Sequence, residues 1–225
     1  MTSKNNILIL AAGRGLAMDG IHKLKLSIPK TNENLKTRLE RQFSADLNVV
    51  IGYKGAEILS EWPEINFSYN HKWYETGSSI SALIGLEKIQ DQLPIIIMPC
   101  DLILSDSAVN KVLESEGDVV FLKQRENRSE SSLNCITNSG KIVDSYRGQK
   151  RNNNDLEAIG IVKISSKKCL TSLLDHTFES ENSFFVEYAV EAFDHFLSVE
   201  ILDAVYEVNS VEDYLSLWES SNDFS

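Results

Sequence analysis

The chain has 225 residues, 42% of them hydrophobic, with only 4 prolines and 11 glycines, which favours a globular protein with a buried core over a linker-rich chain. Its formal net charge of −11 argues against a nucleic-acid partner, because nucleic-acid binding depends largely on basic contacts to phosphates, but it does not exclude a small anionic substrate. No segment approaches the roughly 20 consecutive apolar residues that a membrane-spanning helix needs, so we expect no membrane partner.

The first half of the chain alternates apolar runs with helical patterns. Predicted strands lie at residues 6–10, 47–52, 66–70, 93–98 and 118–122. Predicted helices lie between them at residues 35–43, 56–61, 79–89 and 107–114. This alternation indicates an α/β fold with a mainly parallel sheet flanked by helices. Ligands bind beyond the carboxyl ends of the strands in such sheets, so the segments after Leu10, Gly52, Asn70 and Met98 are the candidate site.

The second half of the chain lacks this alternation. Strands are predicted at residues 132–137, 141–145 and 158–164 without helices between them, so we expect antiparallel strands that extend the sheet. A loop is expected at residues 150–155, and helices at residues 184–193 and 210–219. No repeat or domain boundary is evident, so residues 1–225 are predicted to form a single domain.

The N-terminus and the cysteines predict a cytoplasmic location. The first residues lead directly into an apolar strand, without the apolar segment and cleavage site of a signal peptide. The three cysteines, Cys100, Cys135 and Cys169, are an odd number at wide spacing, which suits reduced thiols better than disulfides and does not match a zinc site.

The strongest local signal directly follows the first predicted strand and consists of Leu10, Ala11, Ala12, Gly13, Arg14 and Gly15. A glycine-rich turn at this place lets backbone N–H groups face a phosphate without a Cβ between them. Dinucleotide-binding folds also begin this way, but they need a third glycine that opens a helix and an acidic residue after the second strand. Here a lysine-containing loop follows, and the second strand ends at Gly52 and Tyr53, so that fold is not favoured.

This turn resembles the N-terminal signature of the nucleotidyltransferase superfamily, in which LAAGxGxRM precedes a lysine-bearing loop on a GT-A-like, Rossmann-like fold. Further matching segments follow in order at residues 20–26 (GIHKLKL), 49–54 (VVIGYK), 70–83 (NHKWYETGSSISAL), 98–101 (MPCD) and 207–214 (EVNSVEDY). The first of these is similar to molybdopterin cytidylyltransferase-like proteins, and the last to phosphocholine and aminoethylphosphonate cytidylyltransferases. The resemblance spans nearly the whole chain and implies transfer of a nucleoside monophosphate from an NTP to a small phosphorylated or phosphonylated acceptor. CTP is the favoured donor, and pyrophosphate is the second product.

The resemblance also implies roles for single residues. Residues 10–15 and Lys23 are expected to bind the triphosphate, and Lys23 is also a candidate catalytic residue, with Lys30 as the competing lysine. Asp101 is expected to be catalytic as the main ligand of Mg²⁺, a cation that prefers hard oxygen ligands. Asn209, where many relatives have aspartate, is the second expected ligand. An aspartate at the end of a strand can also cap the N-terminus of a helix, and this alternative interpretation of Asp101 stays open.

The base and the acceptor have weaker candidates. Gly77, Ser78 and Ser81 are expected to contact the base, although a serine here can also cap the helix that follows. The candidate acceptor-binding residues are Trp73, Tyr74, Glu157 and Tyr188. Aromatic rings and carboxylates of this kind can hold a cationic amine through cation–π contacts, whereas Phe184 and Phe185 are also candidates for the core.

One position departs from the family signature. Ala17 stands where relatives have an arginine that contacts the triphosphate, and Arg14, Lys23 or Lys25 could replace it. The departure keeps open a nucleotide-binding regulatory domain without catalytic activity. A sugar-1-phosphate nucleotidyltransferase is the alternative within enzymes. A GT-A glycosyltransferase is disfavoured, because residues 100–102 (CDL) supply one acid where a DxD motif is needed.

Overall fold

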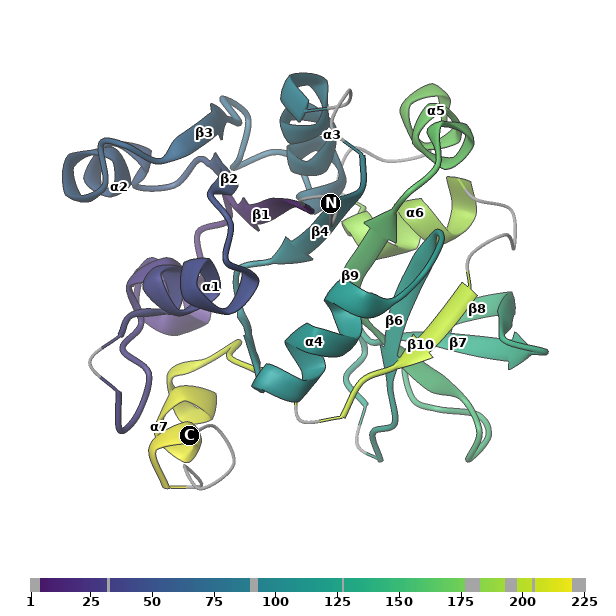
Figure 1. Ribbon diagram of the computed structural model, residues 1–225. Coiled ribbons are helices and arrows are strands. Elements are labelled where there is room, and N and C mark those ends of the chain that lie inside the picture. The colour runs from purple at the N-terminus through teal and green to yellow at the C-terminus, as the bar shows by residue number, and fades with distance from the viewer. Residues whose placement is uncertain are drawn as a thin grey trace.

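The structure is a computed structural model that describes residues 5–31, 33–89, 93–126, 128–176, 183–192, 198–203 and 205–219. These residues form a mixed nine-stranded sheet in the order β3-β2-β1-β4-β9-β6-β10-β8-β7, flanked by helices (Figure 1). Its strands are β1 (Asn6–Ala11), β2 (Leu47–Ile51), β3 (Asn66–Tyr69), β4 (Ile95–Pro99), β6 (Val119–Lys123), β7 (Leu133–Asn138), β8 (Lys141–Arg147), β9 (Leu156–Ile164) and β10 (Ser198–Ile201). A separate two-stranded sheet pairs β5 (Leu102–Leu104) with β11 (Val205–Glu207).

Strands β3, β2, β1 and β4 are parallel, as the alternating sequence pattern predicts. Leu10 in β1 lies opposite Val50 in β2 and Pro99 in β4, so the carboxyl ends of the three strands lie at one edge. Alternate residues of β1 face opposite sides of the sheet, and both sets are buried. Burial on both faces explains why β1 is a continuous aliphatic run rather than an alternating one.

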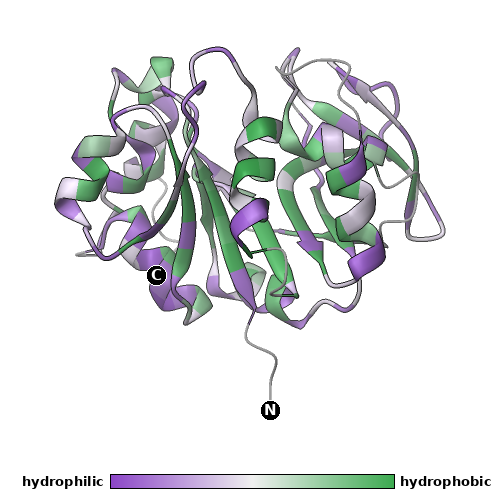
Figure 2. Ribbon diagram, turned by 90° about the horizontal axis from the view of Figure 1, so that it is seen from above, coloured by the Kyte–Doolittle hydropathy of each residue, from purple (hydrophilic) through white to green (hydrophobic). Residues whose placement is uncertain are grey.

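Two layers of helices cover the two faces. One face is packed against α1 (Leu35–Phe43), α2 (Gly55–Glu61), α4 (Asp106–Glu114) and α7 (Val211–Glu219). The opposite face is packed against α3 (Ser78–Ile89), α5 (Lys167–Asp175) and α6 (Phe185–Ala192). Figure 2 shows the hydrophobic strands in the middle of the molecule, between helices that carry hydrophilic residues on their outer sides. The short 3-10 turns η1 (Leu16–Met18) and η2 (Lys23–Lys25) lie in the loop after β1.

The second half of the chain extends this sheet with antiparallel strands, which confirms the expectation from the sequence. Strand β9 pairs antiparallel with both β4 and β6, and β7 and β8 form a hairpin at the far edge. The structure is therefore a mixed, mainly parallel α/β fold of a single domain, in agreement with the predicted fold class.

Four elements were not predicted: β5, β10, β11 and α5. Strands β5 and β11 have three residues each, which is too short to show an apolar period. Helix α5 carries a local start signal, because the Ser166 side chain caps it by accepting a hydrogen bond from the Cys169 N–H. The predicted helix at 184–193 is observed as α6, and residue 193 lies outside the described residues.

Two further expectations concern the cysteines and the membrane. Cys100, Cys135 and Cys169 are all free, as the odd number and wide spacing predict. Among the described helices, we find no segment with both the length and the apolar character needed to cross a bilayer.

Candidate active site

The candidate site forms where the two-stranded β5–β11 ladder meets the carboxyl end of β4. Glu207 in β11 lies opposite Leu102 in β5, and the Val208 N–H donates a 2.9 Å hydrogen bond to the Asp101 carbonyl. This pairing places Asn209 beside Asp101, although 108 positions of the chain separate them.

The start of α7 holds Asn209 in place. Its backbone N–H and that of Ser210 both donate to Asp213 Oδ2, at 2.9 and 2.8 Å, and the Asp213 N–H donates to Ser210 Oγ. The Tyr214 hydroxyl donates to the Ser27 carbonyl, which ties α7 to the loop that contains Lys23. Four residues of the motif at 207–214 thus hold the start of α7 in place: Asn209, Ser210, Asp213 and Tyr214.

Lys23 lies between the two predicted metal ligands. Its Nζ donates to Asp101 Oδ2 at 3.0 Å and to Asn209 Oδ1 at 3.4 Å. Burial disfavours the ammonium, but the charge and hydrogen bond of Asp101, together with the smaller effects of Cys100 and Glu207, raise the pKa of Lys23. The lysine is therefore charged and neutralises Asp101. Lys30, the competing lysine, is exposed, and its backbone has a φ of 60°.

The oxygen atoms of this cluster suit a divalent cation. Asp101 Oδ1 is buried and has no hydrogen-bond partner, which is a costly state for a carboxylate oxygen. Asn209 Oδ1 is a second hard oxygen donor, and one or two protein groups are a common share of an Mg²⁺ shell. Desolvation and the negative charge of Asp101 raise the pKa of the neighbouring Glu207. Within the described residues, no group of three His, Cys, Asp or Glu side chains could hold a metal on its own.

The glycine-rich turn follows β1 at the same edge. The backbone of residues 10–12 is fixed by its neighbours, since the Leu10 and Ala12 carbonyls accept hydrogen bonds from the Cys100 and Tyr53 N–H groups. Gly13 and Arg14 are exposed, and a Cβ built on Gly13 would have no atom within 4 Å. The turn therefore offers open backbone on a rigid support.

His22 anchors this turn to the lysine loop. It is buried, and its Nε2 donates to the Ala11 carbonyl at 3.1 Å. Burial lowers the pKa of His22 to about 4, so the ring is neutral near pH 7. His22 therefore has a structural role.

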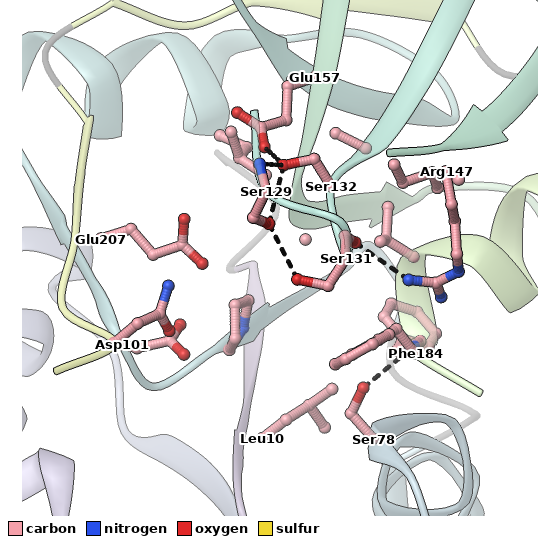
Figure 3. Close-up of a pocket in the computed structure, with 18 of the residues that line it drawn as sticks. Leu10, Ser78, Asp101, Ser129, Ser131, Ser132, Arg147, Glu157, Phe184 and Glu207 are labelled. Carbon is pink, nitrogen blue, oxygen red and sulfur yellow. Dashed lines mark hydrogen bonds between the residues drawn. The ribbon is translucent and has the colours of Figure 1, made fainter. Parts of the chain in front are cut away.

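A cavity of about 440 Å³ opens beside this cluster (Figure 3). Five of the predicted site residues line it: Leu10, Ser78, Asp101, Glu157 and Asn209. Phe184 and Phe185, which the sequence left between the acceptor site and the core, line it too. It is also lined by residues that sequence reasoning did not assign to a site, among them Arg125, Ser129, Ser131, Ser132, Arg147 and Glu207. Most of these lie on the loop between β6 and β7 or at the end of β8, where no short motif marks them.

Comparison with known proteins identifies the family. Residues 7–192 match the model of the MobA-like NTP transferase domain. The chain belongs to this family. It is a nucleotidyltransferase, and the family binds a nucleoside triphosphate and a sugar or phosphate acceptor, generally with a divalent metal ion. A search of curated protein sequences gives no match.

Solved structures with the same fold include three nucleotidyltransferases. The CTP:phosphocholine cytidylyltransferase of Streptococcus pneumoniae is 16% identical with a TM-score of 0.72, over 96% of this chain and 98% of that one. The inositol-1-phosphate CTP transferase of T. maritima is 17% identical with a TM-score of 0.72, over 100% and 99% of the two chains. A UDP-glucose pyrophosphorylase is 16% identical with a TM-score of 0.71, over 96% and 98%. At these identities the likeness shows the shared fold alone.

The predicted base-binding residues of this MobA-like domain lie at the start of α3. Gly77 and Ser78 are half-buried there, and Ser78 Oγ accepts a hydrogen bond from the Phe185 N–H at 2.8 Å. Ser81 is buried, and its Oγ accepts from Asn70 Nδ2 at 3.1 Å. Asn70 also donates to Thr76 Oγ1 at 3.0 Å, so this buried asparagine holds the 70–81 segment in shape. The Ser81 hydroxyl thus serves the local structure.

Of the four predicted acceptor residues, only Glu157 lines the cavity. Trp73 packs edge-on against Tyr53, with ring centroids 5.3 Å apart, and Tyr74 is 66% exposed. The expectation that Tyr188 contacts the acceptor does not hold. Its side chain is buried in the core, and its hydroxyl donates to the Leu173 and His176 carbonyls. The sequence of α6 could not place Tyr188, because aromatic residues occur on several sides of this helix and the pattern does not show which ring faces the core.

Tyr188→Phe should lower the free energy of unfolding by about 1–2 kcal/mol, because the Leu173 and His176 carbonyls lose the O–H donor that they share. Chemical denaturation measures this change, and the KM for the acceptor should not move. Tyr74→Phe is the matched control and should change neither quantity. A raised acceptor KM in Tyr188→Phe would return this residue to the acceptor site.

Proposed function

We propose that this chain transfers CMP from CTP to a small phosphorylated or phosphonylated acceptor, with Mg²⁺ as cofactor and release of pyrophosphate. The observation that carries the proposal is the meeting of Lys23, Asp101 and Asn209 at the carboxyl end of β4, beside a cavity of acceptor size. The family membership supplies the reaction class.

The preference for CTP is supported by two lines of similarity. The segments at residues 70–83 and 207–214 resemble cytidylyltransferases, and two of the structural relatives are described as CTP-using enzymes. A UDP-glucose pyrophosphorylase shares the fold equally well, so a sugar-1-phosphate nucleotidyltransferase is the alternative.

The chemistry asks mainly for positioning and charge neutralisation. An oxygen of the acceptor phosphate attacks the α-phosphorus of the nucleotide, and the bond to the pyrophosphate oxygen breaks. Asp101 and Asn209 would hold Mg²⁺, which supplies positive charge to the triphosphate when bound. Lys23 and the open backbone at Gly13–Gly15 would bind the phosphates, and Gly77 and Ser78 at the start of α3 would contact the base.

The direct test is pyrophosphate release with each of the four NTPs, Mg²⁺ and a panel of phosphate and phosphonate acceptors. We expect kcat/KM to be at least tenfold higher with CTP than with UTP, GTP or ATP. A preference for UTP would favour the sugar-1-phosphate alternative. Nucleotide binding without any pyrophosphate release would favour the regulatory domain.

Asp101→Asn should reduce turnover on the order of 10²-fold or more, because the amide keeps the shape but loses the charge that holds the cation. The midpoint of thermal unfolding should change little, since no core volume is lost. Asp144→Asn, on the exposed face of β8, is the control and should retain full activity. An active Asp101→Asn enzyme would place the metal site elsewhere.

The position of Lys23 generates a prediction about metal binding without nucleotide. Lys23 already neutralises Asp101, so free enzyme should bind a divalent cation weakly. Lys23→Met should therefore bind Mn²⁺ at least several-fold more tightly by calorimetry, while its turnover with NTP falls. Lys30→Met should change neither quantity much. Mn²⁺ should also raise the unfolding temperature of Lys23→Met, because the cation replaces the lost partner of a mostly buried carboxylate. Equal Mn²⁺ affinity in wild type and Lys23→Met would contradict this role.

A further inference from the structure

Arg125 has the most exposed side chain of the charged residues that line the cavity. It follows β6, its side chain is 49% exposed, and its nearest ion-pair contacts are long. Its Nη1 lies 3.5 Å from Glu207 Oε2 and 3.6 Å from Glu157 Oε2. A guanidinium has five N–H donors in a planar fork, so Arg125 can offer a bidentate face to an incoming phosphate.

Arg147, the other arginine of the cavity, is held by the protein itself. Its Nε donates to Glu187 Oε1 at 2.7 Å, its Nη2 pairs with the second Glu187 oxygen, and its Nη1 donates to the Ser131 carbonyl at 3.0 Å. These bonds connect β8, α6 and the loop between β6 and β7. Arg147 therefore supports the cavity wall and has few donors to spare.

Arg125 can release Glu157, one of its two carboxylate partners, for a ligand at low cost. Glu157 keeps two other contacts, because the Ser132 hydroxyl donates to its Oε1 and Arg128 Nη1 lies 3.7 Å from its Oε2. The Arg128 side chain is fully buried and also donates to Asn134 Oδ1, so it stays in place. An anion held by Arg125 would leave no unpaired charge at Glu157.

The wall next to Arg125 consists of hydroxyl groups. Ser129 Oγ lies 2.9 Å from Ser131 Oγ and 3.2 Å from Ser132 Oγ. Figure 3 shows this serine cluster between Asp101 and Glu207 on one side and Arg147 and Phe184 on the other. Hydroxyls both donate and accept hydrogen bonds, so the cluster is complementary to the alcohol groups of a ligand.

Two of the described aromatic residues line the cavity, Phe184 and Phe185, and the Phe185 side chain is buried. The guanidinium of Arg147 lies 4.9 Å from the centroid of the Phe184 ring. A quaternary ammonium ligand needs open aromatic faces, and Phe184 is shared with this cation. Trp73 and Tyr74, the expected cation-binding rings, do not line the cavity. The lining carboxylates Asp101, Glu157 and Glu207 already face Lys23, Arg128 and Arg125, respectively. We therefore take the serine hydroxyls, and not a cation site, as the groups of the described lining that recognise the acceptor.

We propose that Arg125 binds the anionic group of the acceptor, and that Ser129 and Ser131 select an acceptor that carries several hydroxyl groups. The acceptor is then a phosphate ester of a polyol, cyclitol or sugar, and not a phosphorylated quaternary amine. This inference rests on the proposed function and specifies its acceptor. Arg125 contacts Glu207, which adjoins the Asp101–Asn209 pair, so an acceptor phosphate on Arg125 lies beside the reacting centre.

The test compares acceptors and variants in the full chain with CTP and Mg²⁺, by pyrophosphate release. Glycerol 3-phosphate, inositol 1-phosphate and glucose 1-phosphate represent the three hydroxylated sources, and phosphocholine represents the cationic class. We expect at least one hydroxylated acceptor to exceed phosphocholine in kcat/KM by tenfold or more. The best of the three identifies the source.

Arg125→Gln should raise the KM for that acceptor tenfold or more and leave the KM for CTP within twofold, and Arg125→Lys should recover part of the loss. Arg151→Gln, at an exposed arginine that stacks on Tyr146, is the matched control and should behave as wild type. Ser129→Ala with Ser131→Ala should lower kcat/KM for the hydroxylated acceptor and leave any activity with phosphocholine unchanged.

Two results would overturn the inference and leave the proposed function standing. One is efficient turnover of phosphocholine with no activity on hydroxylated acceptors. The other is an Arg125→Gln enzyme with an unchanged acceptor KM. Failure to release pyrophosphate with every NTP and acceptor would instead overturn the proposed function itself, and this inference with it.

Discussion

The candidate site depends on one backbone hydrogen bond, from the Val208 N–H to the Asp101 carbonyl, and on the short β5–β11 ladder that continues it. Without this pairing, Asp101 would lie at the end of β4 with no group from the last part of the chain beside it. With it, Asn209 and Glu207 reach the carboxyl ends of the parallel strands, where the fold leaves its backbone open to ligands. The family match ends at residue 192, so these residues come from outside the matched span.

A cluster of this kind must balance its own charges, because the protein as a whole carries a net charge of −11. It does so pairwise: Lys23 with Asp101, Arg125 with Glu157 and Glu207, and Arg147 with Glu187. Partly buried carboxylates are costly when unpaired. The same pairing leaves cations in the cavity that can turn to a phosphate, so an acidic protein can bind an anionic substrate locally.

Of the three candidate replacements for the missing arginine of the family signature, Arg14 and Lys25 have other partners. Ala17 is exposed on η1, and the guanidinium of Arg14 lies 5.9 Å from the Tyr53 ring centroid. Lys25 is paired with Glu57 and Glu61, each at 2.8 Å. Lys23 is therefore the cation of this loop that reaches Asp101, which concentrates the expected phosphate contacts on one side chain.

The α/β class, the parallel half of the sheet and the order of the motifs could be predicted from the sequence alone. These features depend on local period and on short runs such as residues 6–10 and 10–15, which physical chemistry links directly to buried strands and phosphate-facing turns. Lys23, Asp101 and Asn209 could be named from the resemblance to family motifs, and the structure places Asp101 and Asn209 within hydrogen-bonding distance of Lys23.

The lining of the acceptor cavity, and the division of the aromatic residues between cavity and core, could not be predicted in this way. Arg125, Ser129 and Ser131 lie on a loop without a motif, and their meeting with Glu157 requires β6, β7 and β9 to pair. Tyr188 and Phe184 lie four residues apart at α6, yet the first is buried and the second faces the cavity. Such choices depend on strand pairings and helix packing between distant parts of the chain, which a local sequence pattern does not contain.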